Sequence, residues 1–93
     1  MVYTVFMPRT AADQRAVWGD TPIPFPAAYH PVGRIAAQDL EEAWRFGQND
    51  WAPEGSWNPD HPTRSLTVGD VLVDERGHAW RIERAHFTLL ASL

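Results

Sequence analysis

The chain has no cysteine, no lysine and no apolar run long enough to cross a membrane. The lack of cysteine excludes a disulfide framework, a thiolate metal site and a cysteine nucleophile. Small secreted domains usually depend on disulfides, so this absence favours a cytoplasmic protein. The segment 1–8 begins without a basic region and its apolar run is short, so we expect neither a signal peptide nor a membrane segment.

Positive charge is also scarce. The eight basic residues are all arginine and are outnumbered by twelve acidic ones, so the net charge is −4. Arginine without lysine is typical of a GC-rich coding genome. An acidic chain without a basic block is a poor candidate for non-specific binding to nucleic acid. We therefore do not expect nucleic acid to be the main partner, although a local arginine patch stays open.

Sequence motifs of catalysis are missing too. There is no G-x-S-x-G, no Walker loop and no G-x-G-x-x-G. No two of the four histidines have the i,i+2 or i,i+4 spacing that places two imidazoles on one metal ion. His61, beside Asp60, is the best single candidate for a ligand. The sequence thus predicts no catalytic residue, no metal and no cofactor, and we expect a non-enzymatic protein.

What the chain does contain is enough apolar sequence, 44% of its residues, for one α+β domain spanning 1–93. Residues 2–7 alternate between apolar faces and stop at Pro8, which predicts a strand. Residues 28–35 form a second predicted strand, in which Pro31 favours either an edge position or a later start of the strand.

Two segments between these strands are less regular. Residues 11–18 have room for one or two helical turns. Residues 21–26 have proline at every second position and must be extended. We expect this segment to be a strap that lays Ile23 and Phe25 over the core.

The clearest helix is predicted over residues 36–48. Leu40, Ala43, Trp44 and Gly47 recur at i, i+3, i+4 and i+7 and make one apolar stripe. Acidic residues gather near the start of this segment, where the helix dipole favours them. The sequence thus predicts one main helix, packed against a small antiparallel sheet.

The last third of the chain predicts a C-terminal β-hairpin plus a last strand. Gly69 permits a turn and Asp70 accepts backbone N–H bonds at the start of strand 71–73. Arg64 could bond this turn, with Asp70 as a plausible contact, or the C-terminus of the helix. Residues 74–77 then turn, with Gly77 at the position that favours positive φ, into strand 78–84 and a last strand at 87–90. The predicted core comprises Val5, Ile35, Leu40, Trp44, Leu66, Val68, Val71, Val73, Trp80, Ile82, Phe87 and Leu89.

Residues 50–63 contain three prolines and a glycine, which predict an irregular loop. Loops this long in a small domain are often functional. Exposed tryptophans make anchors for a protein partner, and acidic side chains flank them here. The candidate partner-binding residues are Trp51, Trp57, Asp50, Glu54 and Asp60. The alternative is that both tryptophans fold back and cap the core.

The stretch Arg64-Ser65-Leu66-Thr67-Val68-Gly69-Asp70-Val71, followed by Gly77, Trp80 and Phe87, resembles the C-terminal signature of YodL-like small domains. The helix segment 39–46, with Asn49 and Trp51, is similar as well, so the resemblance covers about residues 28–90. It implies a compact α+β fold and a setting on plasmids, conjugative elements or phages of high-GC bacteria. It brings no catalytic residues. The chain departs from the family pattern at Ala85-His86, where a glycine tends to precede the aromatic residue.

Three functions follow as hypotheses. The first is a small protein-binding module of phage or plasmid origin that modulates a host system, with the tryptophan loop as its surface. The second is a small β-barrel-like module that binds nucleic acid through Arg76, Arg81 and Arg84. The third is a small enzyme with a pocket lined by Asp60, His61 or His86. Net charge favours the first over the second, and the lack of a motif disfavours the third.

Overall fold

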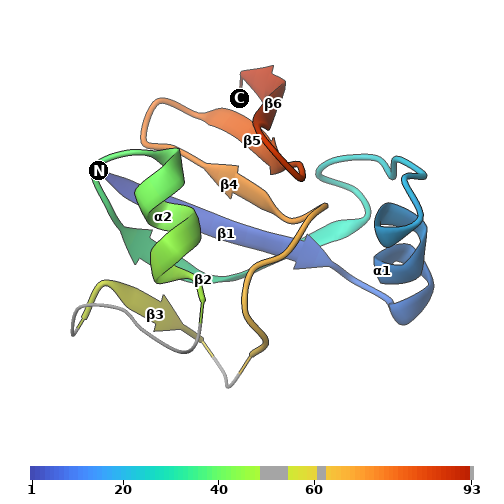
Figure 1. Cartoon of the computed structure of the whole chain (residues 1–93), viewed down its shortest axis with the longest axis horizontal. Coiled ribbons are helices and arrows are strands. Elements are labelled where there is room, and N and C mark those ends of the chain that lie inside the picture. Colours follow the sequence, from blue (N-terminus) through green and yellow to red (C-terminus); the bar gives the residue numbers. More distant parts are fainter. Residues whose placement is uncertain (49–54, 61–62, 93) are drawn as a thin grey trace.

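The computed structural model describes residues 1–48, 55–60 and 63–92, which form one curved antiparallel sheet with two short helices (Figure 1). The sheet has the strand order β3-β2-β1-β4-β5-β6, and every pairing between its strands is antiparallel. The strands are β1 (Val2–Pro8), β2 (Tyr29–Ala36), β3 (Trp57–Pro59), β4 (Val71–Val73), β5 (His78–Ile82) and β6 (Phe87–Ser92).

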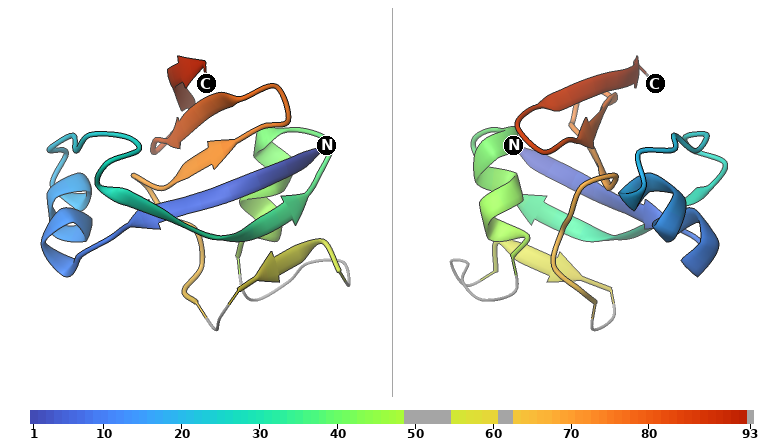
Figure 2. Two further views of the ribbon diagram at one scale, coloured as in Figure 1. Left: turned by 180° about the vertical axis from the view of Figure 1, so that it is seen from behind. Right: turned by 45° about the vertical axis from the view of Figure 1, so that its right-hand side comes forward.

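The topology is two meanders of three strands each. The first, β1-β2-β3, and the second, β4-β5-β6, meet where β1 pairs with β4. The sheet curls, so the turn between β5 and β6 faces the helix after β2 across a hollow that both segments line; the right-hand view of Figure 2 looks along this arrangement. This curl brings residues of the second meander to an element of the first. The α+β class predicted from the sequence is confirmed.

Pro31 does not mark an edge strand, because β2 lies between β1 and β3. The proline is accommodated in two ways. The register between β1 and β2 shifts at Val5/Phe6, and β3 pairs only with the other half of β2, from Gly33 to Ile35. Around Pro31, β2 is therefore not paired with β3, so the proline interrupts no hydrogen bonds between these two strands.

Helix α1 spans Ala11–Trp18 and begins where the side chain of Thr10 accepts the N–H of Asp13. This helix confirms the helical turns expected within residues 11–18. Helix α2 spans Leu40–Phe46 and is shorter than the 36–48 predicted, because Ala36 still belongs to β2 and Asp39 caps the helix. The two helices have eight and seven residues, so neither is a single main helix.

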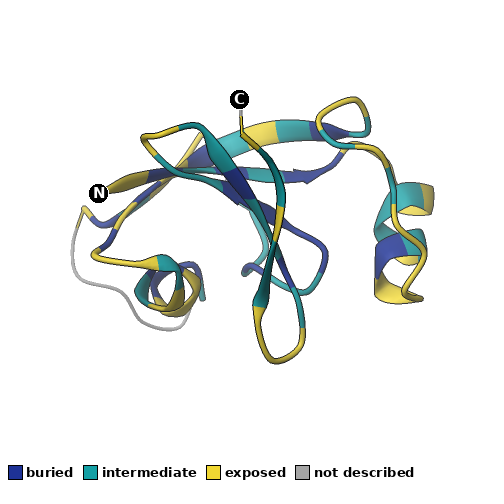
Figure 3. Ribbon diagram, turned by 90° about the horizontal axis from the view of Figure 1, so that it is seen from above, coloured by how far each residue is buried: buried dark blue, intermediate teal, exposed yellow. Residues whose placement is uncertain are grey.

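The two faces of the sheet carry separate clusters. The larger cluster lies under α2 and includes Tyr3, Val5, Ile35, Phe46 and Leu72. The smaller one lies on the opposite face, and its buried residues are Tyr29, Val71 and Ala79. Figure 3 shows the buried positions along the middle of the strands and exposed positions at the hairpin turns.

The proline-rich segment covers the smaller cluster. Ile23 and Phe25 pack against it, as the predicted strap requires. Phe25 makes edge-to-face contacts with Phe6, at 5.3 Å between ring centroids, and with Tyr29, at 5.4 Å. The segment then turns back into β2, because the N–H of Ala28 bonds the carbonyl of Pro24 at 3.0 Å.

Two predicted core residues are wrong. Trp44 is 38% exposed and Leu89 is 49% exposed. On α2 the predicted stripe holds at Leu40, Ala43 and Gly47, but Phe46 is buried in place of Trp44. The remaining predicted core is buried at Val5, Ile35, Leu66, Val71 and Ile82, and half-buried at Leu40, Val68, Val73, Trp80 and Phe87.

The loop predicted over 50–63 contains a strand, contrary to expectation. Residues 57–59 form β3 and pair with β2, with Trp57 opposite Ile35. Gly33 makes this pairing possible, because a side chain there would lie 2.5 Å from the carbonyl oxygen of Asn58. A proline at the end of the strand did not prevent it, since Pro59 closes the short ladder at the sheet edge.

Candidate functional site

A groove runs between α2 and the β5–β6 hairpin; we call it the α2–hairpin groove. It consists of two adjoining hollows of about 380 Å³ and about 680 Å³ that share Glu41, Ala85, His86 and Phe87. The smaller hollow extends along α2 to Trp44, and the larger one extends over β1 and the β4–β5 turn to Tyr3 and Asp74. The groove is on the face of the sheet that α2 covers only in part.

Aromatic side chains line the groove on both sides. Trp44 comes from α2, and Trp80 and Phe87 come from β5 and β6. Trp44 is 38% exposed, whereas the other two are half-buried and Phe87 packs against the larger cluster. Leu66, buried in that cluster, lines the smaller hollow. The groove thus presents apolar surface of the kind that interfaces bury.

The α2 side of the groove is held by a cap. The Oδ1 atom of Asp39 accepts the N–H of Glu42 at 2.9 Å, and Oε1 of Glu42 accepts the N–H of Gln38 at 3.0 Å. These reciprocal bonds satisfy two free donors at the helix start. They also fix Asp39 and Glu41 at the rim of the larger hollow.

The β4–β5 turn fixes the opposite rim. Asp74 accepts the N–H groups of Arg76 and His78 on Oδ1 and the indole N–H of Trp80 on Oδ2, at 2.9, 3.0 and 3.2 Å. Partial burial opposes ionisation, but these hydrogen bonds outweigh it and lower the pKa of Asp74. Gly77 has a φ of +83° in this turn, as predicted. The bond from Trp80 orients its indole beside the groove.

Tyr3 reaches the floor of the larger hollow from β1. The residue is only 3% exposed, and its hydroxyl forms no hydrogen bond within the described residues. Burial, and then the negative charges of Asp39, Asp74 and Glu75, raise the pKa of the Tyr3 hydroxyl. The hydroxyl is therefore a polar atom available in the groove.

A buried ion pair braces the start of the second meander. Arg64 donates to both carboxylate oxygens of Asp70, at 2.7 and 2.8 Å, and Asp70 also accepts the N–H of Thr67. Burial raises the pKa of Asp70, while the Arg64 bonds oppose that shift. Arg64 donates as well to Oε1 of Gln14 on α1. The predicted roles of Arg64 and Asp70 in this turn are confirmed, and they are structural.

The predicted tryptophan loop is described only in part. Trp57 is half-buried and packs against the larger cluster, and Asp60 is exposed. Trp51, Asp50 and Glu54 lie outside the described residues, as does His61.

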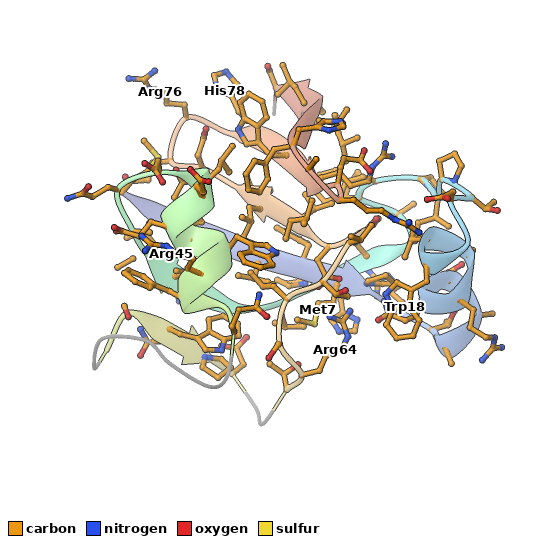
Figure 4. All side chains as sticks on the ribbon, viewed as in Figure 1. Met7, Trp18, Arg45, Arg64, Arg76 and His78 are labelled. Carbon is orange, nitrogen blue, oxygen red and sulfur yellow. The ribbon has the colours of Figure 1, made fainter. Side chains whose placement is uncertain are left out.

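The three arginines of the second hypothesis are not brought together. Arg81 donates to Glu83 at 2.7 Å, and the carboxylate also accepts the hydroxyl of Thr88. Burial acts against ionisation of Glu83, yet these bonds lower its pKa. Arg76 and Arg84 are exposed in the turns at opposite ends of β5. Figure 4 shows Arg76 and His78 projecting from the β4–β5 turn, away from α2.

Within residues 1–48, 55–60 and 63–92, no three His, Asp or Glu side chains are grouped so as to hold a metal ion. His86 lines both hollows of the groove but is exposed. Neither helix in this part of the chain has the length and apolar character needed to cross a membrane.

Sequence reasoning missed the residues that make this groove a site. Tyr3, Trp80 and Phe87 appear in the sequence as alternating strand residues, and two of them were assigned to the core. The signal that existed was on α2, where Phe46 competes with Trp44 for the buried stripe. The proximity of α2 to the β5–β6 turn comes from the curl of the sheet, which no local pattern encodes.

Comparison with known proteins adds no relative. No protein-family model matches the chain, and neither the curated proteins nor the solved structures gave a match.

Proposed function

We propose that this protein is a small, non-enzymatic protein-binding module and that the α2–hairpin groove is its binding surface. The observation that carries the proposal is the groove itself, in which Trp44 is exposed and shares one hollow with Phe87, while Trp80 shares the adjoining hollow with Phe87. Tryptophan at the centre of a contact surface contributes more binding energy than most side chains.

The location of the site differs from the loop hypothesis. Trp57 already packs against the larger cluster, so much of its ring is committed to the fold. Trp44 is the exposed tryptophan that borders a hollow, and its neighbours come from three separate elements. These facts favour the groove over residues 57–60 as the contact surface.

The resemblance of residues 28–90 to YodL-like domains supports a narrower form of the proposal. The module would be encoded by a phage or plasmid and would modulate a host system by binding one of its proteins. A net charge of −4 fits a protein partner better than nucleic acid.

The proposal is tested by selection from a displayed library of random peptides, followed by affinity measurement with purified variants. Trp44→Ala should weaken binding of selected peptides about thirtyfold, which corresponds to about 2 kcal/mol. Alanine favours helix and Trp44 is exposed, so the fold should persist.

The matched control is Trp18→Ala. Trp18 is 50% exposed on α1 and borders none of the hollows described above. This variant should bind the same peptides with unchanged affinity. Equal weakening by both substitutions, or unchanged binding by Trp44→Ala, would show that the groove is not the binding surface.

A further inference from the structure

The inference concerns the Tyr3 end of the α2–hairpin groove and rests on the proposed function. The ring of Tyr3 belongs to the larger cluster, and the residue is 97% buried, yet its hydroxyl lies in the groove without a partner in the described chain. A hydroxyl group at the edge of a buried cluster that forms no hydrogen bond within the described residues can still form one with a ligand.

Carboxylate side chains line the same hollow as Tyr3, namely those of Asp39, Glu41 and Asp74. Glu41 and Glu75 make no ion pair or side-chain hydrogen bond within the described residues, and Asp39 uses one oxygen in the helix cap. Four other carboxylates of the described residues do form ion pairs: Glu42–Arg45, Asp70–Arg64, Asp74–His78 and Glu83–Arg81.

Within residues 1–48, 55–60 and 63–92, no basic group forms an ion pair with Asp39, Glu41 or Glu75. Met1 lines the hollow, but its amino group forms no ion pair with the described carboxylates. Arg76 and His78 project away from α2 (Figure 4). His86 is the basic side chain on the opposite wall, and it is exposed. The Tyr3 end therefore carries excess negative charge.

The walls of the same hollow are aromatic. Trp80 and Phe87 line it, and the indole N–H of Trp80 is already bound to Asp74. Aromatic rings next to carboxylates attract cations, because the ring quadrupole and the carboxylate charge act in the same direction. A neutral apolar ligand would gain from the rings but not from the carboxylates or from the acceptor oxygen of Tyr3.

We propose that the Tyr3 end of the groove binds a cationic side chain, a lysine ammonium or an arginine guanidinium, of the partner segment. The cation would donate to the Tyr3 hydroxyl oxygen and to the carboxylates of Asp39 and Glu41, with its aliphatic stem against Trp80 and Phe87. The partner is thus a protein with a basic, partly apolar segment.

The test uses three small probes and the indole N–H signal of Trp80 in a nitrogen-15 NMR spectrum. The probes are Nα-acetyl-lysine N-methylamide, its neutral analogue Nα-acetyl-norleucine N-methylamide, and butylamine. The lysine probe should shift the Trp80 signal in a saturable way, and the norleucine probe should not. Equal shifts with norleucine, or no saturable shift with lysine, would overturn the proposal. Tighter binding of butylamine than of the lysine probe would also overturn it, because the site would then take a free amine.

Two variants and a control locate the effect. Tyr3→Phe keeps the ring in the core and should weaken the lysine probe about fivefold, the loss of one hydrogen bond. Glu41→Gln should weaken it about twofold, as expected for an exposed charge. Asp20→Asn removes an exposed carboxylate far from this hollow, beside Thr21 and Pro22, and should leave binding unchanged.

Failure of this inference is distinct from failure of the proposed function. If peptides selected in the display experiment depend on Trp44 but carry no basic residue, the groove binds protein and the cation site is wrong. If no peptide depends on Trp44 and the lysine probe still shifts Trp80, the cation site exists and the peptide groove is wrong.

Discussion

The two faces of the sheet are closed in different ways. On one face the proline-rich strap lays Phe25 across Phe6 and Tyr29, and the central residues of that cluster are at most 2% exposed. On the other, the seven-residue helix α2 covers β1 and β2 but stops short of the β5–β6 hairpin. An extended strap covers more length per residue than a helix, so the face with the helix keeps a groove.

The same contrast appears in two tyrosines. Tyr29 on the strap face is 2% exposed and donates its hydroxyl to the carbonyl of Gly69 at 2.6 Å. Its burial, with the negative charge of Asp70, raises its pKa to about 12. Tyr3 on the groove face is buried to the same degree, but its hydroxyl bonds no described residue. The Tyr29 hydroxyl thus stabilises the fold through a hydrogen bond, whereas the Tyr3 hydroxyl forms none within the described residues.

The largest expected effect on the free energy of unfolding compares a buried residue with an exposed residue on the groove face of the sheet. Leu72→Ala removes a fully buried side chain and should lower the free energy of unfolding by about 2–5 kcal/mol. Leu89→Ala on the same face, 49% exposed, should cost less than about 0.5 kcal/mol. Urea unfolding followed by tryptophan fluorescence measures both. Similar losses would mean that Leu89 is part of the core after all.

A smaller effect should separate the two tyrosines. Tyr29→Phe leaves the buried Gly69 carbonyl without its donor and should cost about 1–2 kcal/mol. Tyr3→Phe removes a hydroxyl that bonds nothing in the described chain, so the free energy of unfolding should change by less than about 0.5 kcal/mol. Thermal unfolding of the two variants is the measurement. A costly Tyr3→Phe would assign that hydroxyl to the fold.

The smallest effect is a pH dependence carried by one carboxylate on each face. The pKa values of Asp74 and Glu83 are lowered in the fold, so their ionised forms stabilise it. That contribution is complete above their ordinary values near pH 4 and is lost as the pH falls through the lower pKa of the folded state. Asp74→Asn and Glu83→Gln should each cost up to about 1 kcal/mol near neutral pH and almost nothing near pH 2.

Urea unfolding at both pH values measures this difference. Asp74 anchors the rim of the groove and Glu83 ties Arg81 and Thr88 on the other face, so the two effects should be independent and should add in the double variant. If the loss of unfolding free energy persists at low pH, these side chains stabilise the fold through packing and neutral hydrogen bonds and not through their charge.

Much of this fold follows from local sequence. The alternation in residues 2–7, the glycine at position 77 and the acceptor role of Asp70 are decided within a few residues, and each prediction is confirmed. The end of α2 was harder, because Trp44 and Phe46 are both apolar and lie about 200° apart around the helix, so either could join the buried stripe. Tertiary packing selects Phe46, and local propensity carries no information on that choice.

The site was beyond such reasoning for a physical reason. β3 forms because Gly33 allows the backbone of Asn58 to approach, and the groove forms because the sheet curls until the β5–β6 turn faces α2 across a hollow. Both depend on contacts between residues more than twenty positions apart. The sequence marks aromatic and acidic residues as candidates, but only the assembled sheet shows which of them share a surface.

The central claim is that a protein partner binds in the α2–hairpin groove, and the five tryptophans allow a direct measurement of it. Titration of the nitrogen-15-labelled protein with a peptide selected from the display library should move the indole signals of Trp44 and Trp80 and leave that of Trp18 in place. Shifts confined to Trp51 and Trp57 would contradict the account and assign binding to the tryptophan loop instead.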